Sequence, residues 1–453
     1  MPDEADVRTA APGAAHALQQ WYGADGYARK TGLYSYHDPA LAVQWGNWAS
    51  MSQVGRNLVN TALVLAGQRD RMQDISRWWN SANAITALID YMSVTGDRSY
   101  LEPVVANTFA RAPGTRRPVL SRRVSPSWPF FRLSRGAYQG FINGFYDDEG
   151  WWALAWLDAY DLTGEDKYLA AANDIFLDMA DGWDDYLGGG IYWGKDDGRP
   201  DRAGACAVPH GWTGGYKNAI ANELFVAVAA GLGLRYQHRN PAGPDQASHL
   251  DWARRGWAWF SSPPPAGVAM INQASLVNDS PNRNGVNDNS QSVWSYNQGV
   301  ILSGLSDLTE LSGDPSYLGW AEKIADAFIR NPWRPRAGAD GQVAHPSESG
   351  VIDGILHEHN DCGPGGGPPG RLPSVDSTLF KGIFVRHLAR LYRKSGKPSY
   401  QQFIHTNAQS ALANMNEQHM FGANWAAPVD AADFVRQTAG LDLINAALRV
   451  SAN

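Results

Sequence analysis

Apolar residues return at helical spacing along much of this 453-residue chain. Within residues 82–89, and again within 324–329, they stand three or four positions apart, which places them on one face of a helix. The period-two alternation typical of strands is scarce. The pattern therefore predicts an all-α protein.

A short junction occurs four times, with a polar residue, then Gly, then a charged residue, and a Tyr four positions after the Gly. The pairs are Gly96 with Tyr100, Gly164 with Tyr168, Gly313 with Tyr317, and Gly396 with Tyr400. Glycine readily takes the left-handed conformation that ends a helix. Each junction thus predicts a helical hairpin whose second helix buries the Tyr in its first turn.

The hairpins predict the fold class, an (α/α)6 barrel in which the inner helices are buried on nearly all sides and the outer helices show one apolar face. Apolar runs precede the four turns at 84–91, 152–160, 299–311 and 380–392, and further helices are expected at 41–65, 218–234 and 248–260. No polar linker divides the chain, so we expect one catalytic domain over residues 1–453, structured from about 15 to 450. Gly/Pro-rich stretches at 112–141, 188–215, 263–289 and 331–373 are expected to gather as loops around a site, at the end opposite the turns.

The amino-acid composition excludes some classes of binding partner. The formal net charge of −7 and the charged fraction of 18% offer no basic surface for nucleic acid or for an anionic membrane, so a neutral substrate fits better. The 19 Trp residues are a surplus that suits stacking on sugar rings, although packing between helices is the alternative for any one of them.

The two cysteines, Cys206 and Cys362, are too few for a disulfide framework and lack metal-site spacing, although one bridge between them stays open. The stretch 1–13 has no apolar core of a signal peptide, and no run approaches the length of a membrane span. We therefore expect a cytoplasmic monomer, or a secreted one whose leader has been removed.

The strongest local motif is the acid pair Asp147 and Asp148, which follows a turn signal and precedes an apolar helix. Acidic residues in the first turn of a helix also stabilise it, by capping free N–H groups and by interacting with the helix dipole. A purely structural role of the pair is therefore the alternative. Glycoside hydrolysis needs two carboxyls about 5 Å apart for retention, or about 6.5–9.5 Å apart for inversion. Because neighbouring Cα atoms are about 3.8 Å apart, adjacent acids favour retention, and like charges this close allow one carboxyl to stay protonated.

Three further sets of polar and aromatic residues precede or open inner-helix candidates, at 217–223, 294–299, and 381–386 after Asp376. In a toroid all of them would meet the acid pair at one end. Amides and ammonium groups there could bind sugar hydroxyls, while capping and solvation explain them equally well. The stretch 357–362 contains His, Glu, Asp and Cys, yet its spacing matches no zinc pattern, so Glu358 is expected to act in a substrate loop or structurally. No phosphate-binding loop or nucleophile elbow is found, and no cofactor or metal is expected.

Taken in order, the motifs resemble glycoside hydrolase family 76, the endo-α-1,6-mannanase family. They are 78–84 (WWNSANA), 147–152 (DDEGWW), 189–193 (GGIYW), 217–225 (KNAIANELF), 296–299 (YNQG) and 380–384 (FKGIF). The resemblance implies retaining hydrolysis of α-1,6-mannan, with Asp147 as nucleophile and Asp148 as acid/base. It also points to Asp279 as a sugar-binding acid, with Asp288 as the competing position. The substrate-binding residues expected on these grounds are Trp79, Asn80, Asn83, Trp151, Trp152, Tyr192, Lys217, Asn218, Asn222, Asp279, Tyr296, Asn297, Glu358 and Lys381.

Three alternatives stay open at this point. The same fold could transfer mannan to a sugar acceptor, since a retaining intermediate can be resolved by a hydroxyl in place of water. A terpene-type cyclase would need acid-rich Mg²⁺ motifs, of which this chain has one acidic pair. A carbohydrate-binding protein without turnover would not need the closely paired carboxyls of Asp147 and Asp148.

Overall fold

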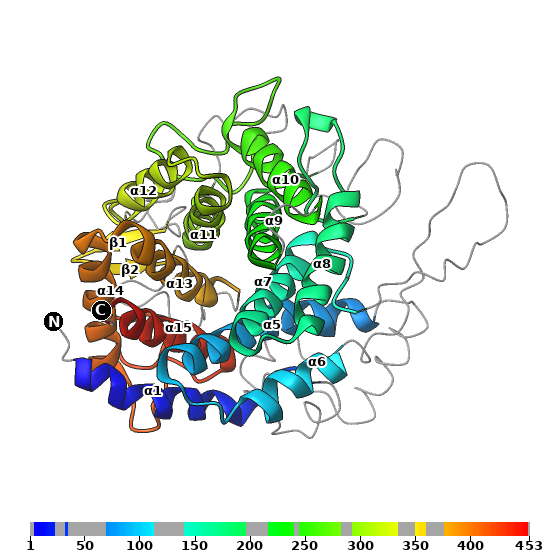
Figure 1. Ribbon diagram of the computed structural model, residues 1–453. Helices are drawn as coiled ribbons and strands as arrows, with labels where there is room; N and C mark the ends of the chain where they lie inside the picture. The colour runs from blue at the N-terminus through cyan, green and yellow to red at the C-terminus, as the bar shows by residue number, and fades with distance from the viewer. Residues whose placement is uncertain are drawn as a thin grey trace.

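The computed structural model describes residues 4–22, 32–34, 69–112, 140–195, 216–239, 244–281, 292–333, 349–358 and 376–451. These residues form twelve α-helices, short 3-10 and π-helical turns, and one two-stranded hairpin. In Figure 1 the view runs down the axis of the barrel, so that the inner helices surround the centre of the molecule.

Six long helices form the inner ring. Each contacts the next, and the last contacts the first, so the ring is closed. They are α5 (Arg69–Thr95), α7 (Tyr146–Thr163), α9 (Ala219–Arg239), α11 (Ser295–Ser312), α13 (Ser377–Ser395) and α15 (Phe434–Ser451).

The outer helices pack against the ring, most of them between two inner helices. They are α6 (Asn107–Arg111), which follows the π-helical turn η3 (Leu101–Ala106), and α8 (Asp166–Asp181), α10 (Pro244–Ser261), α12 (Ser316–Phe328), α14 (Pro398–Asn414) and α1 (Glu4–Leu18). Helix α1 is followed by the short turn η1 (Gln19–Trp21). Because α1 packs on α15, the first and last described helices join (Figure 1). The predicted (α/α)6 barrel is confirmed.

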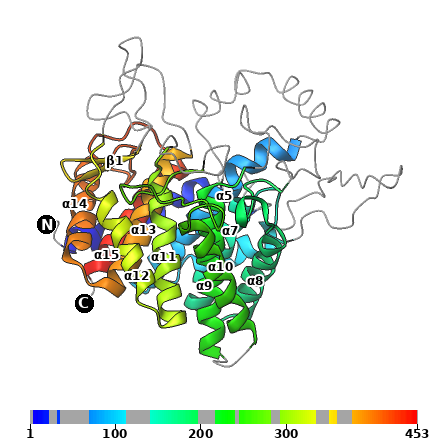
Figure 2. The same ribbon diagram turned by 90° about the horizontal axis from the view of Figure 1, so that it is seen from above.

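All four predicted turns are confirmed. Gly96, Gly164, Gly313 and Gly396 have φ between +65° and +79°, and each donates its N–H to the carbonyl four residues earlier. Of the four tyrosines, those after Gly164 and Gly396 are fully buried and the other two partly buried. We call this end of the ring the turn end. The opposite end, where the inner helices begin, is the site end; from the side, the inner helices lie alongside one another (Figure 2).

The inner helices are apolar because they are enclosed. Helix α9 is the one described helix long and apolar enough to span a membrane, yet 89% of its apolar window is buried in the barrel. Its contact with α11 is close, because a Cβ on Gly304 would lie 3.1 Å from the Cα of Ala227. Burial in the ring therefore accounts for its hydrophobicity.

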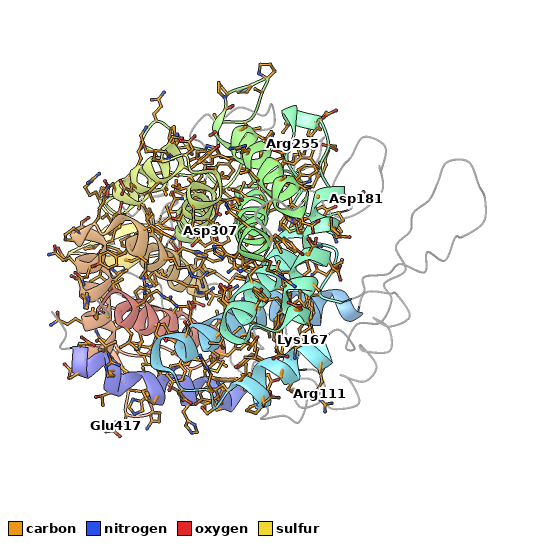
Figure 3. All side chains as sticks on the ribbon, in the orientation of Figure 1. Arg111, Lys167, Asp181, Arg255, Asp307 and Glu417 are labelled. Atoms are coloured by element: carbon orange, nitrogen blue, oxygen red, sulfur yellow. The ribbon has the colours of Figure 1, made fainter. Side chains whose placement is uncertain are left out.

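Charged side chains tie inner helices together across the ring. The guanidinium of Arg390 in α13 reaches Asp90 of α5 at 3.2 Å and Asp158 of α7 at 2.6 Å, and Arg449 of α15 pairs with Asp90 at 3.0 Å. Burial raises the pKa of Asp90, but the two guanidiniums outweigh it and hold that pKa below its ordinary value. Figure 3 shows another acid, Asp307 of α11, within the ring.

The structure also contains elements that the sequence patterns did not predict. Helices α1 and α15 are two of them, and the third is a hairpin of β1 (Gly350–Ile352) and β2 (Ile355–His357) within the predicted loop 331–373. Its two-residue turn, Asp353 and Gly354, has positive φ at both positions, as tight hairpin turns of primed type require. The predicted helices 218–234 and 248–260 are confirmed as parts of α9 and α10, whereas the one at 41–65 lies outside the described residues.

Candidate active site

Asp147 and Asp148 occupy the first turn of α7, at the site end. The backbone just before them is held in extended form: the N–H of Tyr146 donates to the carbonyl of Trp193 at 3.0 Å, and the N–H of Lys195 donates to Gly144 at 2.9 Å. The N–H of Trp193 donates in turn to Tyr216 at 2.8 Å, next to the start of α9. These backbone hydrogen bonds connect the start of α7 with the start of α9 and hold the chain that precedes the acid pair.

Asp147 has a strongly shifted pKa. Burial raises the pKa of its carboxyl to about 7, and the negative charge of Asp376 adds to the rise. Two hydrogen bonds oppose it, from the indole Nε1 of Trp193 to Oδ2 at 2.9 Å and from the N–H of Asp148 to Oδ1 at 3.0 Å. Both bonds favour the carboxylate and partly offset the effect of burial. With a pKa of about 7, Asp147 gains or loses its proton near neutral pH.

The neighbouring acids have different surroundings. Asp148 is 5% exposed and accepts a hydrogen bond of 2.6 Å from the amide of Asn143. Glu149 is fully buried and ion-paired with Lys195 at 2.8 Å; burial raises its pKa well above the ordinary value. Glu149 thus belongs to the wall of the barrel, and its carboxyl differs in its surroundings from those of Asp147 and Asp148.

A third acid, Asp376, stands immediately before α13 and close enough to Asp147 to raise its pKa. Burial raises the pKa of Asp376 itself, while hydrogen bonding by Asn80 and Trp79 lowers it. Sequence reasoning did not place Asp376 among the binding residues. The available signal was an acid directly before the 380–384 motif, a position that also suits a helix cap.

Asp279 lies at the same site. Its Oδ2 accepts a hydrogen bond of 2.6 Å from the hydroxyl of Tyr216, and its Oδ1 lies 3.5 Å from the amide nitrogen of Asn297. Burial first, then the charges of Asp279 and Asp147, raise the pKa of Tyr296 well above the ordinary value. Asp279, Asn297 and Tyr296 therefore meet Asp147 as predicted, whereas the competing Asp288 lies outside the described residues.

Aromatic rings surround these acids. Tyr296 stacks on Phe380 with centroids 3.8 Å apart and planes 5° apart. Trp79 lies 6.0 Å from Trp151 and 6.2 Å from Phe380. Trp152, by contrast, points into the core: it is fully buried and packs on other aromatic side chains, so its predicted contact with substrate is corrected to a packing role.

Lys217 and Tyr192 are also corrected. The ammonium of Lys217 is fully buried and donates to Asp184 Oδ1 at 2.7 Å and to the carbonyls of Tyr186 and Gly189 at 2.8 and 2.6 Å. The hydroxyl of Tyr192 donates to Asp184 Oδ2 at 2.9 Å. Since an ammonium has three donors, these three bonds account for all of them, and Lys217 holds the 184–189 segment.

Three buried asparagines also make bonds within the protein around the site. Asn222 brackets Ile191, accepting from its N–H at 2.8 Å and donating to its carbonyl at 2.9 Å. Asn218 accepts from the N–H of Ala221 at 3.3 Å in the first turn of α9. Asn83 of α5 accepts from Arg386 at 3.0 Å. These bonds hold the walls of the site.

The last two predicted binding residues lie inside the walls. Glu358 is fully buried and accepts hydrogen bonds from Ser295 and Ser349. Lys381 is fully buried, donates to the carbonyl of Ala423 at 2.5 Å and lies 4.8 Å from the ring of Trp425.

No group of three or more His, Cys, Asp or Glu residues that could hold a metal ion occurs within the described parts of the chain. Cys206, Cys362 and the His359 of the 357–362 stretch lie outside those parts.

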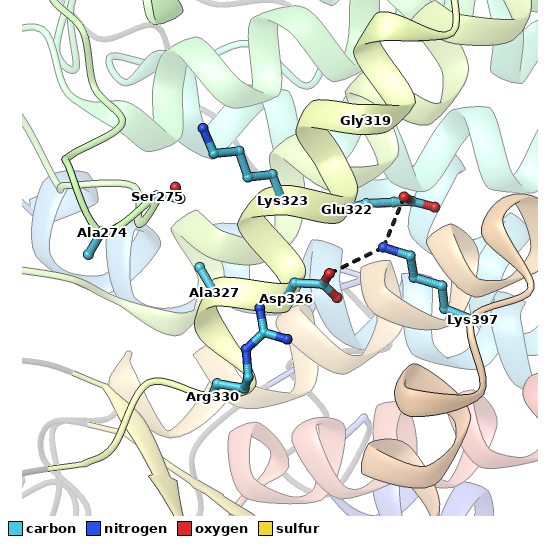
Figure 4. Close-up of a pocket in the computed structure, with 9 residues that line it drawn as sticks. All are labelled: Ala274, Ser275, Gly319, Glu322, Lys323, Asp326, Ala327, Arg330 and Lys397. Atoms are coloured by element: carbon cyan, nitrogen blue, oxygen red, sulfur yellow. Dashed lines mark hydrogen bonds and ion pairs between the residues drawn. The ribbon is translucent and has the colours of Figure 1, made fainter.

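A second depression lies on the outside of the barrel, between α12 and the start of α14 (Figure 4). Its central cation, Lys397, pairs with Glu322 at 2.9 Å and with Asp326 at 3.2 Å. The depression belongs to outer helices and contains none of the acids described at the site end.

Glycoside hydrolases use two carboxyl groups in different surroundings, and here such a pair is flanked by further acids and aromatic rings. Its place at one end of an (α/α)6 toroid indicates the class of toroidal glycoside hydrolases. The chain belongs to glycosyl hydrolase family 76, whose family model matches residues 60–452. The predicted resemblance is confirmed.

Individual relatives are distant. The mannan endo-1,6-alpha-mannosidase DCW1 of Saccharomyces cerevisiae is 23% identical over 369 residues, covering 77% of this chain but only 66% of the yeast protein. Among solved structures, an inactive double-aspartate variant of the alpha-1,6-mannanase GH76A of Salegentibacter sp. HEL1_6, in complex with alpha-1,6-mannotetrose, has a TM-score of 0.57 and 21% identity over 82% of this chain and 89% of that one. The Lin0763 protein of Listeria innocua has a TM-score of 0.63 and 20% identity over 98% and 97%. At these identities the structural likeness establishes the fold.

Proposed function

We propose that this protein hydrolyses α-1,6-mannosidic linkages of mannan-type glycans, with retention at the anomeric carbon. The observation that carries the proposal is the pair Asp147 and Asp148 at the site end, next to Asp376 and Asp279. Membership of family 76 and the names of the relatives support the same substrate class.

In the proposed reaction, Asp147 attacks the anomeric carbon and forms a covalent mannosyl-enzyme while Asp148 protonates the leaving oxygen. Asp148 then takes a proton from water, and the resulting hydroxide releases mannose from Asp147. Two inversions give net retention. The first turn of α7 favours negative charge on Asp147, and the indole N–H of Trp193 supports the same carboxylate.

Sugar recognition falls to the polar and aromatic groups around the pair. The Asp279 carboxylate can accept hydrogen bonds from sugar hydroxyls on its free lone pairs, and the Tyr296 and Trp79 rings offer flat apolar faces. These groups add no positive charge, which fits a neutral glycan. A polymeric mannan does not cross membranes, so this substrate favours the secreted protein over the cytoplasmic one, the two locations that were expected from the sequence.

The test is product analysis on a panel of defined α-mannosides, with NMR of the first product. We expect cleavage of α-1,6-linked mannotetraose with α-anomer released first. Initial β-anomer would reject retention, and cleavage of none of the α-1,6-linked substrates would reject the function.

A further inference from the structure

The carboxyl of Glu223 in α9 is buried beside the site, and the proposed reaction gives it no role. It is fully buried, and neither of its oxygens has a hydrogen-bond partner. Burial, and then the charge of Asp279, raise its pKa well above the ordinary value. An acid kept this close to the sugar-binding carboxylate, without a partner of its own, calls for an explanation.

The backbone shows how Glu223 comes to lie there. The carbonyl of Asp279 accepts the N–H of Ala219 at 2.7 Å, so the Asp279 segment rests on the first turn of α9, and Glu223 follows one turn later. Ala227, a further turn along the same face, touches Gly304 of α11. The face of α9 that carries Glu223 therefore looks toward α11, whose first turn holds Asn297.

Asn297 has unused hydrogen-bonding capacity as well. It is fully buried, its Oδ1 has no partner, and its amide nitrogen lies at 3.5 Å from Oδ1 of Asp279, at the limit of a hydrogen bond. The other oxygen of Asp279 is already held by Tyr216. Of the two carboxylate oxygens of Asp279, Oδ1 is thus the one with only a weak hydrogen bond to hold it in position.

The chemistry of two neighbouring acids decides which of them carries the charge. Two ionised carboxylates in one buried space are unfavourable. Burial raises the pKa of both carboxyls. Only Asp279 has a stabilising hydrogen bond, from Tyr216, so of the two Glu223 is the acid that keeps its proton and Asp279 the one that carries the charge. A neutral carboxylic acid carries a donor hydrogen, which neither Asp279 nor the amide oxygen of Asn297 supplies.

We propose that Glu223 is a positioning residue for Asp279: when an α-mannoside is bound, its protonated carboxyl donates toward Oδ1 of Asp279, directly or through the Asn297 amide. This holds the carboxylate in the orientation that accepts hydrogen bonds from sugar hydroxyls. The inference rests on the proposed function, because it presumes that a sugar meets Asp279.

Binding is measured first, without turnover, by calorimetry with α-1,6-mannotetraose in a parent protein that carries Asp147→Asn and Asp148→Asn. Adding Glu223→Gln keeps size and donor hydrogens, and we expect affinity within about twofold of the parent. Adding Glu223→Met keeps the volume but removes the donor, and we expect affinity about tenfold weaker.

Turnover by the otherwise unchanged enzyme should follow the same order, with Glu223→Met raising KM more than it lowers kcat. Glu223→Gln should leave the pH profile of kcat/KM unchanged, since a neutral acid is replaced by a neutral amide. Asp307→Asn serves as the matched control, a partly buried acid of α11 elsewhere in the ring, and should leave KM unchanged. Thermal melting establishes that each variant is folded.

Three results would overturn the inference: unchanged affinity in Glu223→Met, equal losses in the Gln and Met variants, or a shifted pH limb in Glu223→Gln. They differ from a failure of the proposed function. In that case the parent binds no mannotetraose and the wild-type enzyme cleaves none, and the inference falls with it.

Discussion

The indole Nε1 of Trp193 lies 2.9 Å from Oδ2 of Asp147 and donates a hydrogen bond to it. This bond stabilises the carboxylate, whereas burial stabilises the neutral acid and prevails, so that the pKa of Asp147 is about 7. Trp193 is set in place by the backbone pairing that also precedes α7. A residue 46 positions away in sequence therefore limits how far burial raises the pKa of Asp147.

The first prediction is a pH profile. As a nucleophile Asp147 must be ionised, so kcat/KM should rise with pH through about 7, and it should fall again at the higher pH where the proton donor Asp148 is no longer protonated. Trp193→Phe removes the hydrogen bond to the carboxylate, raises the pKa further and should move the rising limb to higher pH by about half a unit to one unit. Steady-state rates across pH check both. A fall in kcat/KM as pH rises through 7 would instead make Asp147 the proton donor and exchange the two roles.

The second prediction concerns the acid pair. Asp147→Asn and Asp148→Asn should each lower the hydrolysis of an α-1,6-mannooligosaccharide by about 10²–10⁴-fold or more, because each removes one of the two carboxyls that the proposed reaction needs. Circular dichroism should show folded protein. Asp181→Asn, at the exposed end of outer helix α8, is the control and should keep full activity. Near-normal rates in either variant of the pair would remove the catalytic assignment.

The third prediction links Asp147 to stability. Its pKa is about 7 in the folded protein and about 3.9 in an unfolded chain, so between these values the folded state holds a proton that the unfolded state releases. Raising the pH through this window therefore destabilises the folded protein. Asp147→Asn removes the effect, and its melting temperature should exceed that of wild type by more at about pH 8 than at about pH 4. An equal difference at both pH values would contradict the raised pKa.

The fourth prediction tests the corrected role of Lys217. Lys217→Met leaves Asp184 and two carbonyls without their buried donor, and should lower the free energy of unfolding by about 3–5 kcal/mol in the absence of any sugar. Denaturation in urea measures this. A residue that only contacted sugar would instead raise KM and leave the unfolding midpoint where it was.

The fifth prediction concerns the charges that cross the ring. Arg390→Met takes the ion-pair partner from Asp158 and leaves Asp90 paired with Arg449 alone. The side chains of Asp90 and Asp158 are only 7% and 11% exposed, so the change should destabilise the protein by about 2–4 kcal/mol. Lys394→Met, which breaks the exposed pair with Glu310, is the matched comparison and should cost about 0–1 kcal/mol. Similar losses in the two variants would mean that the ring does not depend on the buried network.

Local signals in the sequence were enough for the architecture. A Gly that ends a helix can be recognised from the few residues around it, because left-handed φ depends on the residue and its immediate neighbours. All four predicted turns are present in the structure. Helix α1 escaped notice since Pro12 and Gly13 interrupt it. The β1–β2 hairpin escaped because two three-residue strands carry too little periodicity.

The site was predicted less evenly. The acid pair, Asp279, Tyr296, Asn297, Trp79 and Trp151 meet where the motifs indicated, since every inner helix of a toroid begins at the same end. Some residues that were assigned to the substrate have side chains buried in the walls or the core of the protein, among them Lys217, Asn222, Trp152 and Glu358. Polar motif residues that bind sugar and those that hold the walls look alike in a sequence, because both need a donor or an acceptor at a helix start.

By itself, then, the sequence determined that Asp147 and Asp148 are adjacent and open an apolar helix of a repeated hairpin fold. Tertiary structure alone decided that Trp193, Asp376 and burial set the ionisation of Asp147, and that Glu223 faces Asp279 without a partner. The physical reason is that ionisation depends on distance and desolvation, which the folded ring sets between residues far apart in the chain.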